Sequence, residues 1–273
     1  MKKTVVITGG ARGMGRAVAR KLADAGYFVY SLDIQPGGVE PDDIRNRNIR
    51  DLQVDVCCQE SIDKAYRQIS SEVDRLDGIL HFAGMILMDS LVEIPEEQFL
   101  KIFQVNLFGA YRINKTFLPL ILASEPKGRI LLTTSELAPN RIIPFNSIYS
   151  ISKKALDAYA EGLRMELGLL GVQVITLRPG AVATDLIGHS NRALETLKNN
   201  TKLYQDNTKK FQKIMDAEQG TAIPAERIGE LVLKIFGKKH PKYIYTMNTS
   251  KKLKLLNIVP TGIQVKLYRK LLK

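Results

Sequence analysis

A short strand that runs directly into closely spaced glycines is the feature that most constrains this chain. The β-branched segment Thr4–Thr8 leads into Gly9-Gly10-Ala11-Arg12-Gly13-Met14-Gly15, and a helical pattern follows. Glycines permit a tight turn and close backbone approach, and a helix N-terminus presents unpaired N–H groups that bind phosphate. A glycine cluster alone also fits a plain turn. With a strand before it and a helix after it, the cluster indicates a dinucleotide-binding βαβ unit.

Short β-branched runs alternate with longer segments of helical spacing along the rest of the chain. The expected strands are Thr4–Thr8, Phe28–Asp33, Asp51–Val56, Gly78–Phe82, Arg129–Thr134, Val172–Arg178 and Lys242–Tyr245. The expected helices cover about 14–25, 60–74, 95–123, 149–169 and 225–236. This alternation predicts an α/β fold, because right-handed crossovers between parallel strands give one doubly wound (Rossmann) sheet. We expect about seven parallel strands with helices on both faces.

The 273 residues contain no repeat, low-complexity segment or linker that would divide the chain. We therefore expect one dinucleotide-binding and catalytic domain over 1–248, followed by a basic C-terminal extension over 249–273. The interval between Ala181 and Pro224 is too long for a simple connection from a strand to the next helix. We predict that it holds a substrate lid over about 181–223.

The positive charge is concentrated near the C-terminus. The formal net charge is +12, from 40 Lys and Arg against 28 Asp and Glu. Residues 231–273 hold 11 of the basic residues and no acidic residue, so the rest of the chain is nearly neutral. No helix-turn-helix, zinc-finger or aromatic RNA-binding motif accompanies this charge. We therefore expect no nucleic-acid partner.

The tail has its own pattern, which favours two explanations equally. From Pro260, apolar residues fall on one helical face and basic residues on the other. The apolar residues are Ile263, Leu267, Tyr268, Leu271 and Leu272, and the basic residues are Lys266, Arg269, Lys270 and Lys273. A basic amphipathic helix predicts peripheral contact with an anionic membrane through residues 250–273. A helix packed on the body or on a neighbouring subunit fits the same pattern.

Cysteine content and hydropathy predict the protein's setting. Cys57 and Cys58 are adjacent, too close for an ordinary disulfide and too few for a metal cage, so we interpret them as reduced thiols and predict no metal site. No apolar run approaches the roughly 20 residues that a membrane-spanning helix needs. The N-terminal apolar stretch is too short for a signal peptide. We expect a cytoplasmic protein, with the tail as its one candidate membrane contact.

Asp33 points to the type of dinucleotide. It ends the second expected strand, where its carboxylate can accept hydrogen bonds from the ribose hydroxyls and would repel a 2′-phosphate. This predicts NAD(H) as the preferred cofactor. Arg12 favours NADP(H), because a guanidinium beside the glycine turn pairs with phosphate. A solvated loop carboxylate is the alternative interpretation of Asp33.

Further motifs resemble those of the short-chain dehydrogenase/reductase family, in the family order and at the family spacing over about residues 3–245. Among its members, the chain most resembles the hydroxysteroid- and retinol-dehydrogenase-like enzymes. The glycine turn matches the family pattern Thr-Gly-x-x-x-Gly-x-Gly, and Tyr149-Ser150-Ile151-Ser152-Lys153 matches Tyr-x-x-x-Lys. The resemblance implies a catalytic set of Asn106, Ser135, Tyr149 and Lys153. The motifs and the resemblance together indicate a set of cofactor contacts, namely Gly9, Arg12, Gly13, Met14, Gly15, Asp33, Ile34, Asp55, Val56, Ala83, Gly84, Tyr149, Lys153, Pro179, Gly180, Val182 and Thr184.

One motif departs from the family pattern. The fourth strand usually ends in Asn-Asn-Ala-Gly or similar, and here it reads His81-Phe82-Ala83-Gly84. Backbone contacts to the cofactor survive this change, whereas the side-chain bonds of the missing asparagine do not. We interpret His81 as a core or sheet-end residue and not as a catalyst.

The pairing of Tyr149 with Lys153 suits hydride transfer to a ketone or from an alcohol. Tyrosine, with a pKa of about 10, is a poor base near neutrality, and a cation four residues later on the same helical face is expected to lower that pKa. Tyr111 and Lys115 have the same spacing but no serine about 13–14 residues earlier. We expect them to be surface or subunit-contact residues. By resemblance, Ser135 polarises the carbonyl and Asn106 supports a proton-relay water.

Three largely apolar segments are expected around the substrate. They are Met85–Met88, Leu137–Phe145 and, in the lid, the residues Leu186, Ile187, Leu203, Tyr204, Phe211, Ile214 and Met215. They predict a lipophilic alcohol or ketone that is steroid-, bile-acid- or retinoid-like, although the same segments also fit core or subunit surface. The alternatives are a 3-ketoacyl reductase that uses NADPH and acts on carrier-bound acyl chains, and a non-catalytic nucleotide sensor. The resemblance also implies a homodimer or homotetramer.

Overall fold

The computed structural model describes residues 2–35, 48–218 and 222–273, without the side chains of 185–191 and 216–218. Its centre is a seven-stranded sheet in the order β3-β2-β1-β4-β5-β6-β9, with every neighbouring pair parallel. The strands are β1 (Thr4–Thr8), β2 (Phe28–Asp33), β3 (Ile49–Gln53), β4 (Gly78–His81), β5 (Arg129–Thr133), β6 (Gln173–Pro179) and β9 (Ile244–Met247). The predicted doubly wound parallel sheet is confirmed.

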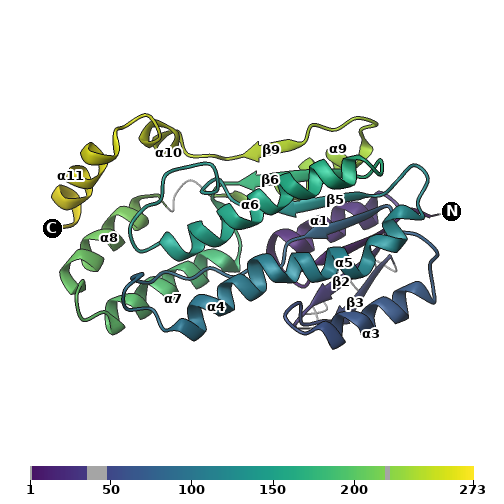
Figure 1. Cartoon of the computed structure of the whole chain (residues 1–273), viewed down its shortest axis with the longest axis horizontal. Coiled ribbons are helices and arrows are strands. Elements are labelled where there is room, and N and C mark those ends of the chain that lie inside the picture. Colours follow the sequence, from purple (N-terminus) through teal and green to yellow (C-terminus); the bar gives the residue numbers. More distant parts are fainter. Residues whose placement is uncertain (1, 36–47, 219–221) are drawn as a thin grey trace.

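Helices cover both faces of this sheet because its strands are apolar on both sides. Along β1, Val6 enters the core on one face, whereas Val5 and Ile7 enter the core on the other. The first core is completed by α3 (Gln59–Ser70), α5 (Gly109–Leu122) and α6 (Ser147–Gly168). The second is completed by α1 (Gly13–Asp24) and α9 (Glu226–Gly237). Figure 1 shows the two helical layers with the sheet between them.

Several predicted element boundaries are wrong by one to four residues, and two differences from the prediction bear on the site. The third strand ends at Gln53, not at Val56, because its partner β2 ends at Asp33, the residue that pairs with Gln53. The expected single helix over 95–123 is three pieces, α4 (Glu96–Phe103), a π-helical segment η1 (Gln104–Phe108) and α5. The wider π-helical turn contains Asn106, whose side chain is drawn into hydrogen bonds with neighbouring elements.

The predicted lid interval is mostly helical. It begins with β7 (Val182–Ala183), which pairs with β8 (Ile223–Pro224), and it contains α7 (Asp185–Asn200) and α8 (Gln205–Glu218). The C-terminal extension forms α10 (Lys251–Leu256) and α11 (Thr261–Leu272). In Figure 1, α11 lies beside α8 at the end of the molecule far from the N-terminus. Among the described residues, no helix combines the length and apolar character needed to cross a bilayer.

Candidate active site

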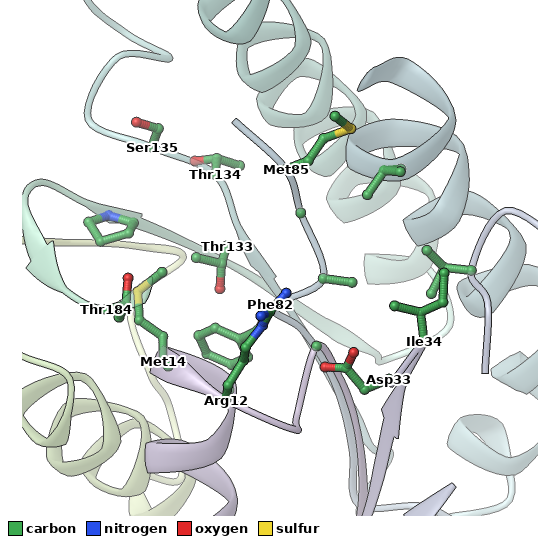
Figure 2. Close-up of a pocket in the computed structure, with 18 of the residues that line it drawn as sticks. Arg12, Met14, Asp33, Ile34, Phe82, Met85, Thr133, Thr134, Ser135 and Thr184 are labelled. Carbon is green, nitrogen blue, oxygen red and sulfur yellow. The ribbon is translucent and has the colours of Figure 1, made fainter. Parts of the chain in front are cut away.

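A cavity of about 420 Å³ opens at the carboxyl ends of the parallel strands. The strand order reverses there, because β1 is flanked by β2 on one side and β4 on the other. Such a reversal leaves a crevice outside the strand ends that binds ligands in open α/β sheets. Figure 2 shows Asp33 and Ile34 on one side of it and Met14 and Thr184 on the other. Every residue that the sequence indicated as a cofactor contact lines this cavity.

The glycine turn has the close backbone packing that a phosphate cradle needs. Gly9 has a φ of +69°, and a Cβ atom there would lie 2.5 Å from the main-chain nitrogen of Ala83. A Cβ at Gly15 would lie 2.0 Å from the carbonyl oxygen of Gly9. These contacts admit only glycine, so the turn stays compact and open at the N-terminus of α1. The residues therefore fit the pyrophosphate of a dinucleotide.

Asp33 supports the same turn from the end of β2. Its carboxylate accepts hydrogen bonds from the main-chain nitrogens of Ala11 at 3.1 Å and Gln35 at 3.3 Å. Each carboxylate oxygen accepts more than one bond, so these contacts leave room for ribose hydroxyls. Arg12 lines the cavity as well (Figure 2). The structure therefore brings together at one site the two residues that the sequence analysis linked to dinucleotide preference.

The predicted catalytic residues Ser135, Tyr149 and Lys153 are buried and line the same cavity. Ser135 follows β5, whereas Tyr149 and Lys153 lie on α6. The Lys153 Nζ atom lies 5.9 Å from the centre of the Tyr149 ring and donates to the carbonyl oxygen of Thr133 at 3.1 Å. Spacing of four residues on one helix therefore brings the cation beside the phenol, as expected.

The expected lowering of the Tyr149 pKa by Lys153 is wrong for this structure. Burial raises the pKa of Tyr149 to about 12; a hydrogen bond with Ser135 lowers it, and the nearby charge of Glu136 raises it. Burial also lowers the pKa of Lys153 to about 8. At neutral pH, Tyr149 is thus a protonated phenol, which suits a proton donor to an alkoxide.

Asn106 ties the π-helical segment to both sides of the site. Its Nδ2 donates to the Met85 carbonyl oxygen at 3.0 Å and to the Ser152 hydroxyl at 2.9 Å, and its Oδ1 accepts from the Met85 nitrogen at 2.8 Å. A Cβ atom on Gly84 would lie 3.3 Å from this oxygen and 3.5 Å from Lys153 Nζ. The predicted residue therefore sits directly behind the Ala83-Gly84 wall, although it does not itself line the cavity.

His81 is a buried core residue, as predicted. Its Nε2 lies 2.7 Å from the Asn114 side-chain oxygen, and Asn114 in turn donates to the Tyr159 hydroxyl at 3.2 Å. Burial lowers the pKa of His81 to about 4, so the ring is neutral. Tyr111 and Lys115, the second tyrosine–lysine pair, are exposed on α5, also as predicted.

Comparison with known proteins identifies the family. Residues 3–195 match the short chain dehydrogenase family. The chain belongs to the short-chain dehydrogenase family. It is 28% identical over 239 residues to 3-ketodihydrosphingosine reductase of Bacteroides thetaiotaomicron, covering 88% of this chain and 85% of that protein. It is 32% identical over 201 residues to bovine mitochondrial D-beta-hydroxybutyrate dehydrogenase, covering 70% of this chain but 58% of the bovine protein.

Solved structures show the same fold. A short-chain dehydrogenase from Streptomyces avermitilis superposes with a TM-score of 0.74 at 18% identity, covering 99% of this chain and 95% of that one. The 3-ketoacyl-(acyl-carrier-protein) reductase from Brucella melitensis, in complex with NADH, gives a TM-score of 0.73 at 18% identity, covering 90% and 96%. This short-chain dehydrogenase is therefore an oxidoreductase that acts on CH–OH groups with a nicotinamide dinucleotide.

Sequence reasoning missed a half-buried ion-pair network beneath the site of this short-chain dehydrogenase. Asp157 on α6 accepts from Nε and Nη2 of Arg178, at 2.9 and 2.6 Å, and from the Thr134 hydroxyl at 3.0 Å. Thr134 directly precedes Ser135, and Arg178 directly precedes Pro179. Asp157 therefore fixes the ends of β5 and β6 relative to the helix that carries Tyr149. A carboxylate four residues after Lys153 was the only sequence clue.

The cavity also has lining residues that the sequence did not single out as cofactor contacts. They are Leu32, Val54, Phe82, Met85, Lys101, Val105, Thr133 and Thr134. Most of them are adjacent in sequence to a predicted residue, so they could have been predicted as further residues near the strand ends. Lys101 comes from α4 and could not be found in this way, because it reaches the cavity through helix packing.

The lid residues expected around the substrate differ in burial, and none of those whose side chains the structure describes lines the cavity. Phe211 is buried and forms an edge-to-face contact with Phe145, with ring centres 5.5 Å apart, and Tyr204 packs on Phe145 at 5.4 Å. Met215 packs against the same cluster. Leu203 and Ile214 are exposed instead, by 66% and 39%. The side chains of Leu186 and Ile187 lie outside the described residues.

Proposed function

We propose that this protein is an NAD(H)-dependent oxidoreductase that interconverts a lipophilic secondary alcohol and its ketone, of steroid-, bile-acid- or retinoid-like character. The observation that carries the proposal is one cavity lined by the Ser135–Tyr149–Lys153 group at one end and by the glycine turn and Asp33 at the other. A non-catalytic nucleotide sensor would not need the first group. Nicotinamide, when bound, supplies or accepts the hydride.

The chain's own residues would move the proton and hold the substrate. Ser135 donates a hydrogen bond to the carbonyl oxygen, which polarises the bond to carbon. In reduction, the carbonyl carbon gains a hydride and the Tyr149 hydroxyl gives its proton to the oxygen. In oxidation, the Tyr149 phenolate takes the alcohol proton. Lys153 places a positive charge beside the phenolate, and Asn106 holds the Met85 segment that closes the other wall.

The side chains that would face the substrate support a lipophilic one. Met85, Ile86 and Leu87 pack with Tyr149 and Leu137 in one apolar cluster. A second cluster joins Phe145 to the lid through Phe211 and Met215. Two relatives carry the names of lipophilic substrates, the Bacteroides 3-ketodihydrosphingosine reductase and rat estradiol 17-beta-dehydrogenase 2, the latter 30% identical over 68% of this chain and 50% of its own length. The bovine relative is named for hydroxybutyrate.

Asp33 supports NAD(H) as the preferred cofactor, because its carboxylate lines the cavity at the end of β2. Arg12 supports the second candidate function, a 3-ketoacyl reductase that uses NADPH, since its guanidinium lines the same cavity and pairs with phosphate. The fold of the Brucella 3-ketoacyl-(acyl-carrier-protein) reductase is similar. The proposal ranks Asp33 above Arg12 because a carboxylate repels a 2′-phosphate directly.

We also propose that the protein is cytoplasmic and assembles as a homodimer or homotetramer. Exposed apolar side chains on η1, α5 and α6 support this assembly, namely Phe108 and Tyr111, each 43% exposed, and Met165, 64% exposed. The proposal also includes peripheral membrane contact through 250–273. Light scattering of the full chain measures the oligomer, and a monomer at micromolar concentration would contradict that part.

Steady-state turnover tests the catalytic proposal. The rate is followed by nicotinamide absorbance with NADH and NADPH against steroid, retinoid, aliphatic and ketoacyl-thioester carbonyls, with Tyr149→Phe as the control. We expect NADH-dependent reduction of one lipophilic class, slowed about 10²–10⁴-fold in the variant. Preference for NADPH on a ketoacyl thioester would favour the second candidate. Dinucleotide binding without turnover of any substrate would favour a sensor.

A further inference from the structure

The C-terminal extension is fastened directly to the loop that follows Ser135. The main-chain nitrogen of Ser250, the N-cap residue of α10, donates to the carboxylate of Glu136. The Asn257 side chain donates to the Asn140 side-chain oxygen at 2.7 Å and accepts from the Arg141 nitrogen at 2.9 Å. Leu253 packs on the apolar cluster that contains Tyr149. The extension therefore adjoins the active site.

Helix α11 uses one face to hold the lid helix α8. Gln264 and Leu272 are buried, and Tyr268 and Leu272 pack in the cluster that contains Phe211. The Asn207 side chain on α8 donates to the Leu272 carbonyl oxygen at 2.7 Å. Residues 264, 268 and 272 are spaced by four, so they form one continuous seam along the helix. The predicted alternative of a tail packed on the body is correct for this face.

A second stripe of α11 is apolar and faces solvent. Ile263, Leu267 and Leu271, also spaced by four, are exposed by 56%, 38% and 47%. Lys266 and Lys270 are exposed and lie three residues after Ile263 and Leu267, so the basic stripe runs directly beside the apolar one. Leu255 and Ile258, on and just after α10, are exposed as well. The extension thus presents apolar and basic side chains together.

The charge of this surface selects the kind of partner. Within the described part of the chain, none of Lys266, Arg269, Lys270 and Lys273 forms an ion pair. Residues 231–273 contain no Asp or Glu that could neutralise them. A symmetric dimer through this surface would set the same lysines against one another, which disfavours a second copy as the occupant. An anionic bilayer offers negative headgroups to the lysines and an acyl boundary to the leucines.

We propose that α11 docks this protein on an anionic membrane, with Ile263, Leu267 and Leu271 inserted at the headgroup level and Lys266 and Lys270 on the lipid phosphates. Because an adjacent face of α11, roughly 100° around the helix, holds α8, docking places the lid close to the bilayer surface. Resting on the proposed function, this arrangement would let a lipophilic substrate pass between the membrane and the cavity without crossing bulk water.

Vesicle flotation of the full chain tests the proposal without any need for turnover. The probes are vesicles of phosphatidylcholine alone and of phosphatidylcholine with 30% phosphatidylglycerol. We expect flotation with the anionic vesicles, released by high salt, and weak recovery with the neutral ones. Lys266→Gln/Lys270→Gln should weaken partitioning about 30-fold, since each lysine contributes about a factor of five. Leu267→Gln/Leu271→Gln, which removes the apolar contact, should weaken partitioning as well.

Matched variants far from α11 provide the controls. Leu169→Gln removes an 88% exposed leucine after α6, and Lys64→Gln/Arg67→Gln removes two exposed basic residues of α3. Both should float like the wild type, with unchanged circular dichroism in every variant. Equal flotation with neutral and anionic vesicles, or undiminished flotation of the α11 variants, would overturn the proposal. So would failure of the wild type to float while it binds an acidic carrier protein. Flotation without oxidoreductase activity would uphold docking and reject the proposed function alone.

Discussion

The ammonium group of Lys153 donates a hydrogen bond to the main-chain carbonyl of Thr133 over 3.1 Å. This bond joins α6 to the last residue of β5, two residues before Ser135, and it holds a cation in a buried position. Burial lowers the pKa of Lys153 from its usual value near 10.5 to about 8. Folding therefore disfavours the charged form of Lys153, although the proposed chemistry needs that form. As a result, charged Lys153 lowers the free energy of unfolding by a measurable amount.

The first prediction concerns stability as a function of pH. Below pH 8, Lys153 is charged in both folded and unfolded states, and the full penalty of burial applies. Between pH 8 and 10.5, the unfolded state binds the proton that the folded state has lost, so this penalty disappears as pH rises. Relative to Lys153→Met, the wild type should gain roughly 2–3 kcal/mol in free energy of unfolding from pH 7 to 10. Urea unfolding of both proteins at the two pH values measures it, and parallel pH profiles would contradict it.

The second prediction concerns the pH dependence of turnover. With the pKa of Tyr149 at about 12, its phenolate is scarce at neutrality, so alcohol oxidation should accelerate steadily from pH 7 to 10. Ketone reduction needs the protonated phenol and should show no such rise. Glu136→Gln removes a charge that raises this pKa but keeps an acceptor oxygen, so its oxidation profile should move to lower pH. Oxidation rates that are equal at pH 7 and 9 would count against Tyr149 as the base.

The third prediction tests the Asp157 network. Asp157→Ala leaves the Arg178 guanidinium, whose side chain is 19% exposed, without its carboxylate, and should lower the free energy of unfolding by about 3 kcal/mol. Turnover should fall as well, since Ser135 and Pro179 follow the two residues that Asp157 binds. Asp157→Leu/Arg178→Met removes both charges and should recover most of the stability but not the activity. Denaturation and kcat of the wild type and the two variants separate the two effects, and a double variant as unstable as Asp157→Ala would refute the ion-pair explanation.

The fourth prediction concerns dinucleotide preference. Asp33→Asn keeps a side-chain acceptor for the Ala11 nitrogen while removing the charge that repels a 2′-phosphate. The ratio of kcat/KM for NADH to that for NADPH should fall at least tenfold, about 1.4 kcal/mol. Adding Arg12→Gln to Asp33→Asn should reverse part of the increase in kcat/KM for NADPH. A wild-type preference for NADPH would show that Arg12, not Asp33, controls the choice.

Local sequence patterns were enough to predict the fold class and the positions of the residues that bear the proposed chemistry. Strand periodicity and the glycine turn depend on neighbours within about ten residues, so local patterns predicted β1, β2 and the helix at Gly13 correctly. The Tyr149–Lys153 pair lies on one helix and was equally visible. Parallel strands that end at one edge then gathered the predicted cofactor residues into a single cavity.

The protonation and packing of these groups depend on contacts between segments that are distant in the sequence. The pKa values of Tyr149 and Lys153 depend on burial by elements far away in the chain, and burial outweighed the local effect of the lysine on the phenol. The bond between Glu136 and Ser250 joins residues 114 positions apart, so no local pattern could reveal that the tail is fastened to the active site. The same packing left one apolar stripe of α11 in solvent, because a helix can bury only the face that meets its neighbour.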